Sequence, residues 1–142
     1  MAYTISQRER EDITTIISDV LRGDERVIFA YLYGSFVTGS FFNDIDIFLF
    51  TRKTEDLFVC SSSIREELFR AVTKAGFGAF AVDDFDVRII NDAPYDFVID
   101  LLCEGRLIVD KNPDLRTGYI EKISDEYRVN YFVLDEAFHA GR

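Results

Sequence analysis

Residues 33 to 50 read YGSFVTGSFFNDIDIFLF, and two aspartates, Asp44 and Asp46, stand there in a run of strand-forming residues. Residues i and i+2 of a strand point to the same face, about 6.5 Å apart along the chain, so the two carboxylates project together. Without a counterion such a pair repels, and one carboxyl tends to stay protonated. A divalent cation removes this conflict. The pattern therefore predicts a strand that is anchored in the core and carries two metal-binding carboxylates at its rim.

The pair Gly34-Ser35 precedes this strand and closes the apolar run of residues 27–33. Backbone N–H groups at a turn between a strand and a helix bind anions. Glycine lets a phosphate approach closely, and the serine hydroxyl adds a donor. A lone Gly-Ser or Asp-x-Asp is common, but the two together, in this order, predict a site for a nucleoside triphosphate. Positioning and charge neutralisation are most of what phosphoryl or nucleotidyl transfer requires of a protein.

Helical and strand-like periodicities alternate along the chain, which indicates the α/β class. Its 142 residues contain no internal repeat or linker, so we expect a single domain over residues 1–142. Ser6 and Glu9 have the spacing of a capping box at the start of the first helix, and Gly23 supplies its end. Further helices are expected over 62–75 and 94–104 and from 112 onward, and strands over 27–33, 44–51, 85–90 and 107–109.

The C-terminal segment predicts one long helix with an aromatic-rich stripe. Asn112-Pro113 has the form of a cap followed by a first-turn proline. The stripe either packs on the sheet or in part docks a partner, and the sequence leaves both readings open. Its residues recur every three or four positions: Leu115, Tyr119, Ile123, Tyr127, Tyr131, Leu134 and Phe138.

Composition excludes several classes of protein. The net charge of −10 argues against direct binding of nucleic acid, although a nucleotide accompanied by metal ions remains compatible with it. Cys60 and Cys103 are far apart and read as isolated thiols in a reducing cell, and the single His139 argues against a histidine-based triad or a zinc site. The polar N-terminus and the lack of a long apolar run predict a cytoplasmic protein with no membrane span.

The Gly-Ser turn followed by Asp-x-Asp resembles the signature of the minimal nucleotidyltransferases of the DNA polymerase β superfamily. The stretch FDVRIINDAPYDFVIDLLCEGRLIVDKNPDLR, residues 85–116, is similar to the matching part of MntA-type antitoxins. The resemblance covers roughly residues 27 to 120. It implies the palm-like nucleotidyltransferase fold, a mixed sheet of about four strands flanked by helices, with a long C-terminal helix.

The resemblance also assigns roles to five residues. Gly34 and Ser35 would hold the triphosphate of ATP. Asp44 and Asp46 would bind Mg²⁺, with two ions expected. Asp86 matches the third carboxylate of the family, which would complete the metal shell and help to deprotonate the attacking hydroxyl. These three aspartates are the expected catalytic and metal-binding residues.

Two further aspartates lie close to Asp86 in the sequence. Asp84 lies two residues before Asp86 and is the second choice for the third carboxylate, whereas Asp83 is expected to be solvated.

Eight residues separate Ser35 from Asp44, fewer than in most of the family, and the FVTGSFFN segment lacks the usual acidic and basic residues. Loops tolerate such shortening, but the choice of base or acceptor could differ.

The resemblance implies an antitoxin that silences a HEPN-domain ribonuclease toxin by transferring AMP from ATP to a toxin tyrosine. The expected partners are the toxin, in a possible hetero-oligomer, and a nucleoside triphosphate. Two alternatives stay open: nucleotidyl transfer to a small molecule, and a non-catalytic antitoxin that acts by binding alone. The acidic net charge suits a basic, RNA-binding partner.

Overall fold

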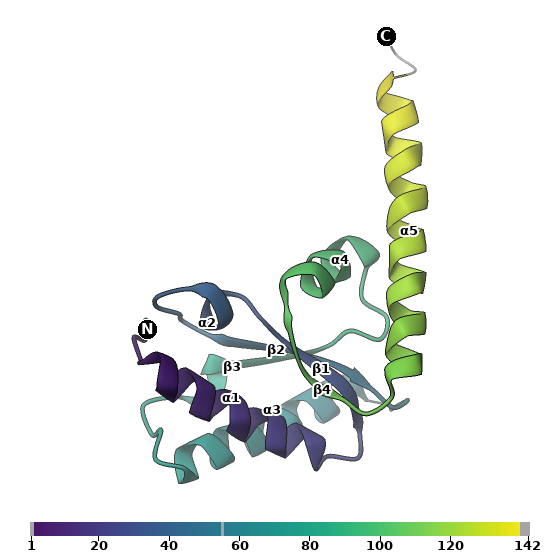
Figure 1. Cartoon of the computed structure of the whole chain (residues 1–142). Coiled ribbons are helices and arrows are strands. Elements are labelled where there is room, and N and C mark those ends of the chain that lie inside the picture. Colours follow the sequence, from purple (N-terminus) through teal and green to yellow (C-terminus); the bar gives the residue numbers. More distant parts are fainter. Residues whose placement is uncertain (1, 55, 140–142) are drawn as a thin grey trace.

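The computed structural model describes residues 2–54 and 56–139, with side chains as far as residue 130. Its four strands are β1 (Val27–Tyr33), β2 (Ile45–Thr51), β3 (Phe85–Ile89) and β4 (Arg106–Asp110). They form one sheet in the order β3-β2-β1-β4 (Figure 1). Strand β1 is antiparallel to both β2 and β4, whereas β2 and β3 are parallel. The predicted four-stranded mixed sheet is confirmed.

Two layers of helix cover the two faces of this sheet (Figure 1). One layer holds the first and third helices, and the other holds the fourth and fifth. A one-turn helix follows β1, and a short 3-10 helix precedes β3. The helices are α1 (Gln7–Arg22), α2 (Ser35–Thr38), α3 (Leu57–Lys74), η1 (Val82–Asp84), α4 (Tyr95–Glu104) and α5 (Pro113–His139).

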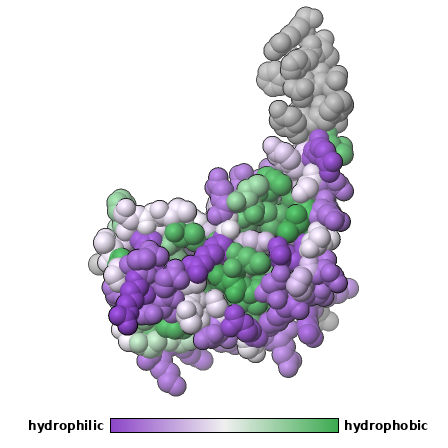
Figure 2. Space-filling view, viewed as in Figure 1, coloured by the Kyte–Doolittle hydropathy of each residue, from purple (hydrophilic) through white to green (hydrophobic). Residues whose placement is uncertain are grey.

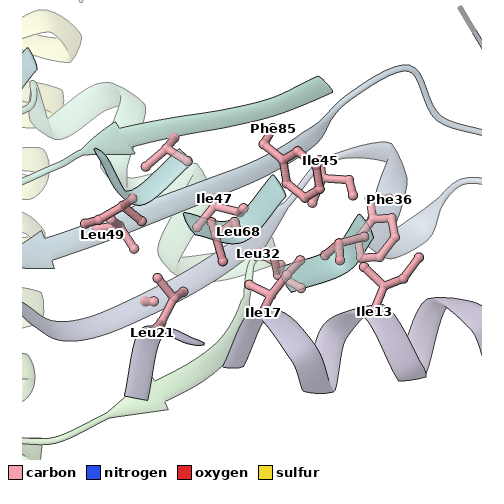
Figure 3. Close-up of a cluster of buried hydrophobic side chains, with 14 of the residues drawn as sticks. Ile13, Ile17, Leu21, Leu32, Phe36, Ile45, Ile47, Leu49, Leu68 and Phe85 are labelled. Carbon is pink, nitrogen blue, oxygen red and sulfur yellow. The ribbon is translucent and has the colours of Figure 1, made fainter. Parts of the chain in front are cut away.

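The core beneath α1 and α3 includes the apolar residues of α1, which recur with helical spacing and so lie on one face of that helix. The capping box of Ser6 and Glu9 is formed as predicted, and Gly23 ends the helix. The buried face of α1 meets one side of the central strands and the inner face of α3 (Figure 3). The labelled members of this cluster are Ile13, Ile17, Leu21, Leu32, Phe36, Ile45, Ile47, Leu49, Leu68 and Phe85.

A second, more aromatic core lies on the other face of the sheet, under α4 and α5. Phe29 and Phe50 stack with their ring centroids 4.8 Å apart, and Tyr119 of α5 packs against both. The Tyr119 hydroxyl is buried and donates a hydrogen bond to the Ile90 carbonyl at 2.8 Å. The cluster comprises Phe29, Tyr31, Phe48, Ile90, Val98, Leu101, Tyr119 and Ile123.

The aromatic stripe of α5 therefore has a buried first part and a more exposed continuation. Its first turns, with Tyr119 and Ile123, pack on the sheet, as one of the two readings expected. Tyr127 is 41% exposed and its ring meets that of Tyr95 with 6.4 Å between centroids. The helix continues past α4 and away from the sheet (Figure 1). The side chains of Tyr131, Leu134 and Phe138 lie outside the described residues.

Helix α3 begins at Leu57, five residues before the predicted Ser62. The Asp56 side chain accepts a hydrogen bond from the Val59 backbone N–H at 3.0 Å and so caps the helix early. The apolar periodicity alone did not indicate this start, because the first turn of α3 carries exposed apolar residues: Leu57, Phe58 and Val59.

The surface is not uniformly polar. On the face shown in Figure 2, apolar surface gathers over β4 and α4, between hydrophilic stretches of α1 and α5. Leu107 of the edge strand β4 contributes an exposed side chain. Within the described ranges, no helix combines the length and the apolar character needed to span a bilayer.

The buried Tyr119 hydroxyl gives a direct measure of how α5 is held. Tyr119→Phe keeps the ring but leaves the Ile90 carbonyl without this donor, so the free energy of unfolding should fall by about 1–2 kcal/mol. Tyr119→Leu also removes ring contacts and should cost more. Urea denaturation monitored by circular dichroism measures both. Equal stability of Tyr119→Phe and the wild type would show that this bond does not hold α5.

Candidate active site

Strand β2 carries Asp46 and begins one residue after Asp44, and not at Asp44 as expected. Ile45 and Ile47 are fully buried in the core beneath α1 and α3. Asp46, between them, lies on the opposite face and is half-buried. Asp44 is exposed and directly precedes the strand, and its charge acts on Asp46. The apolar residues thus fix the backbone while the carboxylates stand at its rim.

The parallel pairing of β2 and β3 brings the third carboxylate to the same place. Asp86 is the register partner of Asp46, and Ile45 pairs with Phe85. Phe85 is fully buried with Ile45, so Asp86 lies on the face of the sheet that carries Asp46. Two segments 40 residues apart along the chain therefore meet at one carboxylate pair.

The Gly34 backbone lies directly against Asp46. Tyr33 is the register partner of Asp46 across β1 and β2, and Gly34 follows with φ of +91°, a conformation that favours glycine. A Cβ atom built on Gly34 would lie 2.6 Å from Asp46 Oδ2. Glycine is thus required both by its backbone angle and by the carboxylate. The structure joins the Gly-Ser turn to the aspartate strand, although each is a weak signal alone.

Helix α2 begins at Ser35, immediately after this glycine. The Gly34 carbonyl accepts hydrogen bonds from Val37 N–H at 3.0 Å and Thr38 N–H at 3.3 Å. The first N–H groups of a helix have no partner within the helix, so those of Ser35 and Phe36 can bind an anion. The phosphate-binding role expected of Gly34 and Ser35 stays a prediction.

A cavity of about 290 Å³ opens beside α2. The Tyr33 hydroxyl donates a hydrogen bond to Glu104 Oε2 at 3.3 Å across it. Burial raises the pKa of Tyr33, with a further contribution from the nearby Glu104 carboxylate, so the phenol stays a hydrogen-bond donor. The cavity is lined by Tyr33, Gly34, Ser35, Thr38, Gly39 and Glu104.

A larger cavity of about 440 Å³ lies at the other end of β2, around Phe50, Thr51 and Asn91. Neither cavity is lined by Asp44, Asp46 or Asp86, so cavity size and lining do not by themselves locate the site. Gly34 and Ser35 line the smaller cavity, and the Gly34 backbone lies against Asp46. We therefore assign the site to the end of the sheet where Asp46 and Gly34 meet.

Arg10 of α1 holds the shortened segment between Ser35 and Asp44, a role that sequence reasoning missed. Its side chain is 7% exposed and donates hydrogen bonds to the carbonyls of Phe36 at 2.7 Å, Ser40 at 2.8 Å and Ser35 at 3.3 Å. The guanidinium carbon lies 5.2 Å from the centroid of the Phe42 ring. Among the described residues Arg10 has no carboxylate partner, so backbone carbonyls and aromatic rings balance its charge.

The sequence does contain a signal for Arg10. It lies three and seven residues before Ile13 and Ile17, which places it on the buried face of α1. A charged residue at such a position must find polar partners inside the protein. Here those partners come from the FVTGSFF segment, which the spacing alone could not identify.

Burial and the neighbouring carboxylates raise the pKa of Asp46 to about 6. Burial is the largest cause, followed by the charges of Asp86 and Asp44, and Arg88 opposes them. The repulsion predicted from the spacing is therefore present, with Asp86 acting on Asp46 more strongly than Asp44 does.

Asp84, the second choice for the third carboxylate, is engaged elsewhere. It accepts hydrogen bonds from the Tyr3 hydroxyl at 2.5 Å and the Ala81 backbone N–H at 2.7 Å, and so fixes the turn before β3. Asp83 is solvated, with a side chain that is 90% exposed. The geometry thus favours Asp86 over both.

The donor set is compatible with Mg²⁺, which prefers carboxylate oxygens and completes its shell with water and phosphate. The close contact between Gly34 and Asp46 leaves the carboxylate face free of side-chain bulk. In residues 2–54 and 56–130, however, no three acidic, histidine or cysteine side chains converge as a ready metal-binding group. Asp86 instead faces Arg88, with Oδ2 at 3.1 Å from Nη2 and Oδ1 at 3.4 Å from Nε.

The raised pKa of Asp46 predicts that this carboxylate destabilises the metal-free fold. Its unfolded pKa is near 3.8 and its folded pKa about 6, so the contribution of this carboxyl to stability is fully present below about 3.8 and is lost as pH rises through about 6. At pH 8 without metal, Asp46→Asn should be more stable by about 1–2 kcal/mol, a discounted value because the group is half-solvated. Urea denaturation from pH 5 to 8 measures the free energy of unfolding. The matched control is Asp83→Asn, which changes an exposed carboxylate. A less stable Asp46→Asn would contradict it.

The buried Arg10 predicts a large and local loss of stability. Arg10→Met removes the guanidinium donors from the Phe36 and Ser40 carbonyls, whereas the Ser35 carbonyl keeps its bond from the Gly39 N–H. The substitution should cost about 2–4 kcal/mol, while Arg10→Lys keeps the charge and should lose less. Exposed Arg8→Met on the same helix should change stability by less than about 0.5 kcal/mol. Hydrogen exchange of residues 35–42 should quicken first in Arg10→Met, and uniform loosening of the whole domain would count against this anchoring role.

Comparison with known proteins agrees with this geometry. The sequence model of the family described as "Polymerase beta, Nucleotidyltransferase" matches residues 15–114. None of the curated proteins matches the chain. Among solved structures, a chain of the toxin–antitoxin MntA-HepT is 15% identical, with a TM-score of 0.54, over 94% of this chain and 99% of that chain.

Two further solved structures are similar. One is described as a tri-AMPylated HEPN toxin of Shewanella oneidensis in complex with MNT antitoxin, at 18% identity and a TM-score of 0.52, over 94% of this chain and 99% of that one. The other is described as a toxin–antitoxin with AMP-PNP, at 20% identity and a TM-score of 0.56, over 88% and 98%. The shared fold, together with the family match over most of the chain, leads to one conclusion: the chain belongs to the polymerase β nucleotidyltransferase family.

Proposed function

We propose that this chain transfers AMP from ATP to a tyrosine hydroxyl of a HEPN-domain ribonuclease toxin and so acts as its antitoxin. The observation that carries the proposal is the contact between the Gly34 turn and Asp46, with Asp86 in register beside it. A phosphate-binding turn and carboxylates that suit a divalent cation meet at one end of the sheet. This is the arrangement that nucleotidyl transfer needs.

Each residue of the site has a separate proposed role. Asp44, Asp46 and Asp86 would hold Mg²⁺, which would supply charge neutralisation and make the acceptor hydroxyl more acidic. The N–H groups of Ser35 and Phe36 bind the terminal oxygens of the triphosphate. Asp86 takes the proton of the acceptor hydroxyl.

The transfer is a substitution at the α-phosphorus. The tyrosine oxygen forms a bond to this phosphorus after its proton has moved to Asp86, and the bond from the phosphorus to the bridging oxygen breaks. Pyrophosphate leaves with that electron pair, and the turn at Gly34 and Ser35 holds its charge. The product is a phosphodiester between AMP and tyrosine.

Three observations support a protein acceptor of this kind. The net charge of −10 suits a basic partner. Helix α5 extends beyond the sheet, and apolar surface over β4 and α4 is available for contact (Figures 1 and 2). Similar chains occur in structures described as complexes of an MNT antitoxin with a HEPN toxin, one of them tri-AMPylated.

Labelled ATP tests the chemistry. Incubation of the chain with labelled ATP, Mg²⁺ and a co-encoded HEPN-domain protein should add the mass of AMP to a tyrosine of that protein, measured by mass spectrometry. Asp44→Asn with Asp46→Asn should lower the rate at least about 1,000-fold, because metal-assisted charge stabilisation is lost. The double variant Asp19→Asn with Asp83→Asn, which removes two exposed carboxylates, should keep the wild-type rate.

The outcomes separate the three readings of function. An unmodified partner under conditions of tight binding would overturn the proposal. If the Asp44 and Asp46 double variant still protects cells from the toxin, neutralisation depends on binding alone. Transfer of AMP to a small hydroxyl compound without any modified protein would point to a small-molecule acceptor.

A further inference from the structure

Arg88 is the cation that faces the carboxylates of the site. It lies two residues after Asp86 on the edge strand β3, and therefore on the same face of the sheet. Its guanidinium forms a fork on Asp86, with Nη2 3.1 Å from Oδ2 and Nε 3.4 Å from Oδ1. Both oxygens that a divalent cation would use on Asp86 are thus engaged by Arg88.

The fork is accessible and can open. The side chain of Arg88 is 60% exposed and that of Asp86 is 31% exposed. An ion pair with this much solvent contact is worth little in stability. A divalent cation at Asp86 would therefore displace the guanidinium at small cost, and the long arginine side chain would be released beside the bound nucleotide.

Other cations near the site are already committed. Arg10 is buried and bonded to backbone carbonyls, and Arg106 pairs with Glu11 at 2.8 Å. The FVTGSFFN segment beside the triphosphate contains no lysine or arginine.

We propose that Arg88 is an exchangeable counterion: it pairs with Asp86 in the free protein and moves to the nucleotide phosphates when a divalent cation takes Asp86. This inference rests on the proposed nucleotidyltransferase function and adds a phosphate-binding residue to it. Arginine suits the task because its planar fork matches carboxylate and phosphate oxygens alike. Arg88 therefore competes with the metal before the nucleotide arrives and assists binding afterwards.

The exchange predicts two effects of opposite sign for Arg88→Met. Mn²⁺ alone should bind the variant about three- to fivefold more tightly, because the competitor on Asp86 is gone. An ATP analogue with a methylene group between the α- and β-phosphates should bind the variant, at saturating Mn²⁺, about tenfold more weakly. Electron paramagnetic resonance of free Mn²⁺ measures the first affinity, and titration calorimetry the second.

Controls isolate the fork from general charge effects. Arg88→Lys keeps the charge and should fall between wild type and Arg88→Met for the analogue. Arg70→Met removes an exposed arginine on α3 that is paired with Glu66, and should leave both affinities unchanged. In an Asp86→Asn background, Arg88→Met should no longer tighten binding of Mn²⁺.

Each outcome decides the question. Weaker binding of both Mn²⁺ and the analogue to Arg88→Met, or unchanged binding of either, overturns the exchange role. The proposed function is then still supported, because the wild-type chain binds both probes. A wild-type chain that binds neither probe overturns the proposed function and this inference with it. Opposite changes in the two affinities support the exchange.

Discussion

The close approach of the Gly34 backbone to the Asp46 carboxylate is the constraint on which the site depends. A Cβ atom at position 34 would lie 2.6 Å from Asp46 Oδ2, and the φ of +91° excludes an ordinary residue there as well. This contact exists because β1 and β2 pair with Tyr33 opposite Asp46, while β3 adds Asp86 on the other side. Sheet register, and not loop conformation, thus brings the Gly34-Ser35 turn and the carboxylates together.

Register alone does not fix the direction of the turn. The segment after Gly34 is short and contains few polar side chains, so its carbonyls need donors from outside. Arg10 supplies three of these hydrogen bonds from the buried face of α1. A buried charge that is balanced by carbonyls and rings is costly to move, and this cost keeps α2 in place. Rigidity where the triphosphate is expected to lie therefore originates in the first helix.

Much of this arrangement could be predicted from local sequence. The capping box of α1, the apolar strand β2 and the Gly-Ser turn are short-range patterns, and each is found where it was expected. The position of Asp86 beside Asp46 came from family resemblance, because no local pattern shows which strands are neighbours. The remainder depends on long-range pairing. The hydrogen bonds from Arg10 to backbone carbonyls join segments 25 to 30 residues apart. The Asp86–Arg88 fork is near in sequence, but its importance depends on Asp46 lying on the next strand.

The two separate cores have an evolutionary consequence. Ile45 and Ile47 anchor the aspartate strand in the core beneath α1 and α3, whereas α5 is held by the aromatic core on the opposite face. Substitutions along α5 beyond Ile123 therefore leave the packing beneath the carboxylates undisturbed. The surface proposed to meet a partner can in this way vary in sequence while the scaffold of the site is retained.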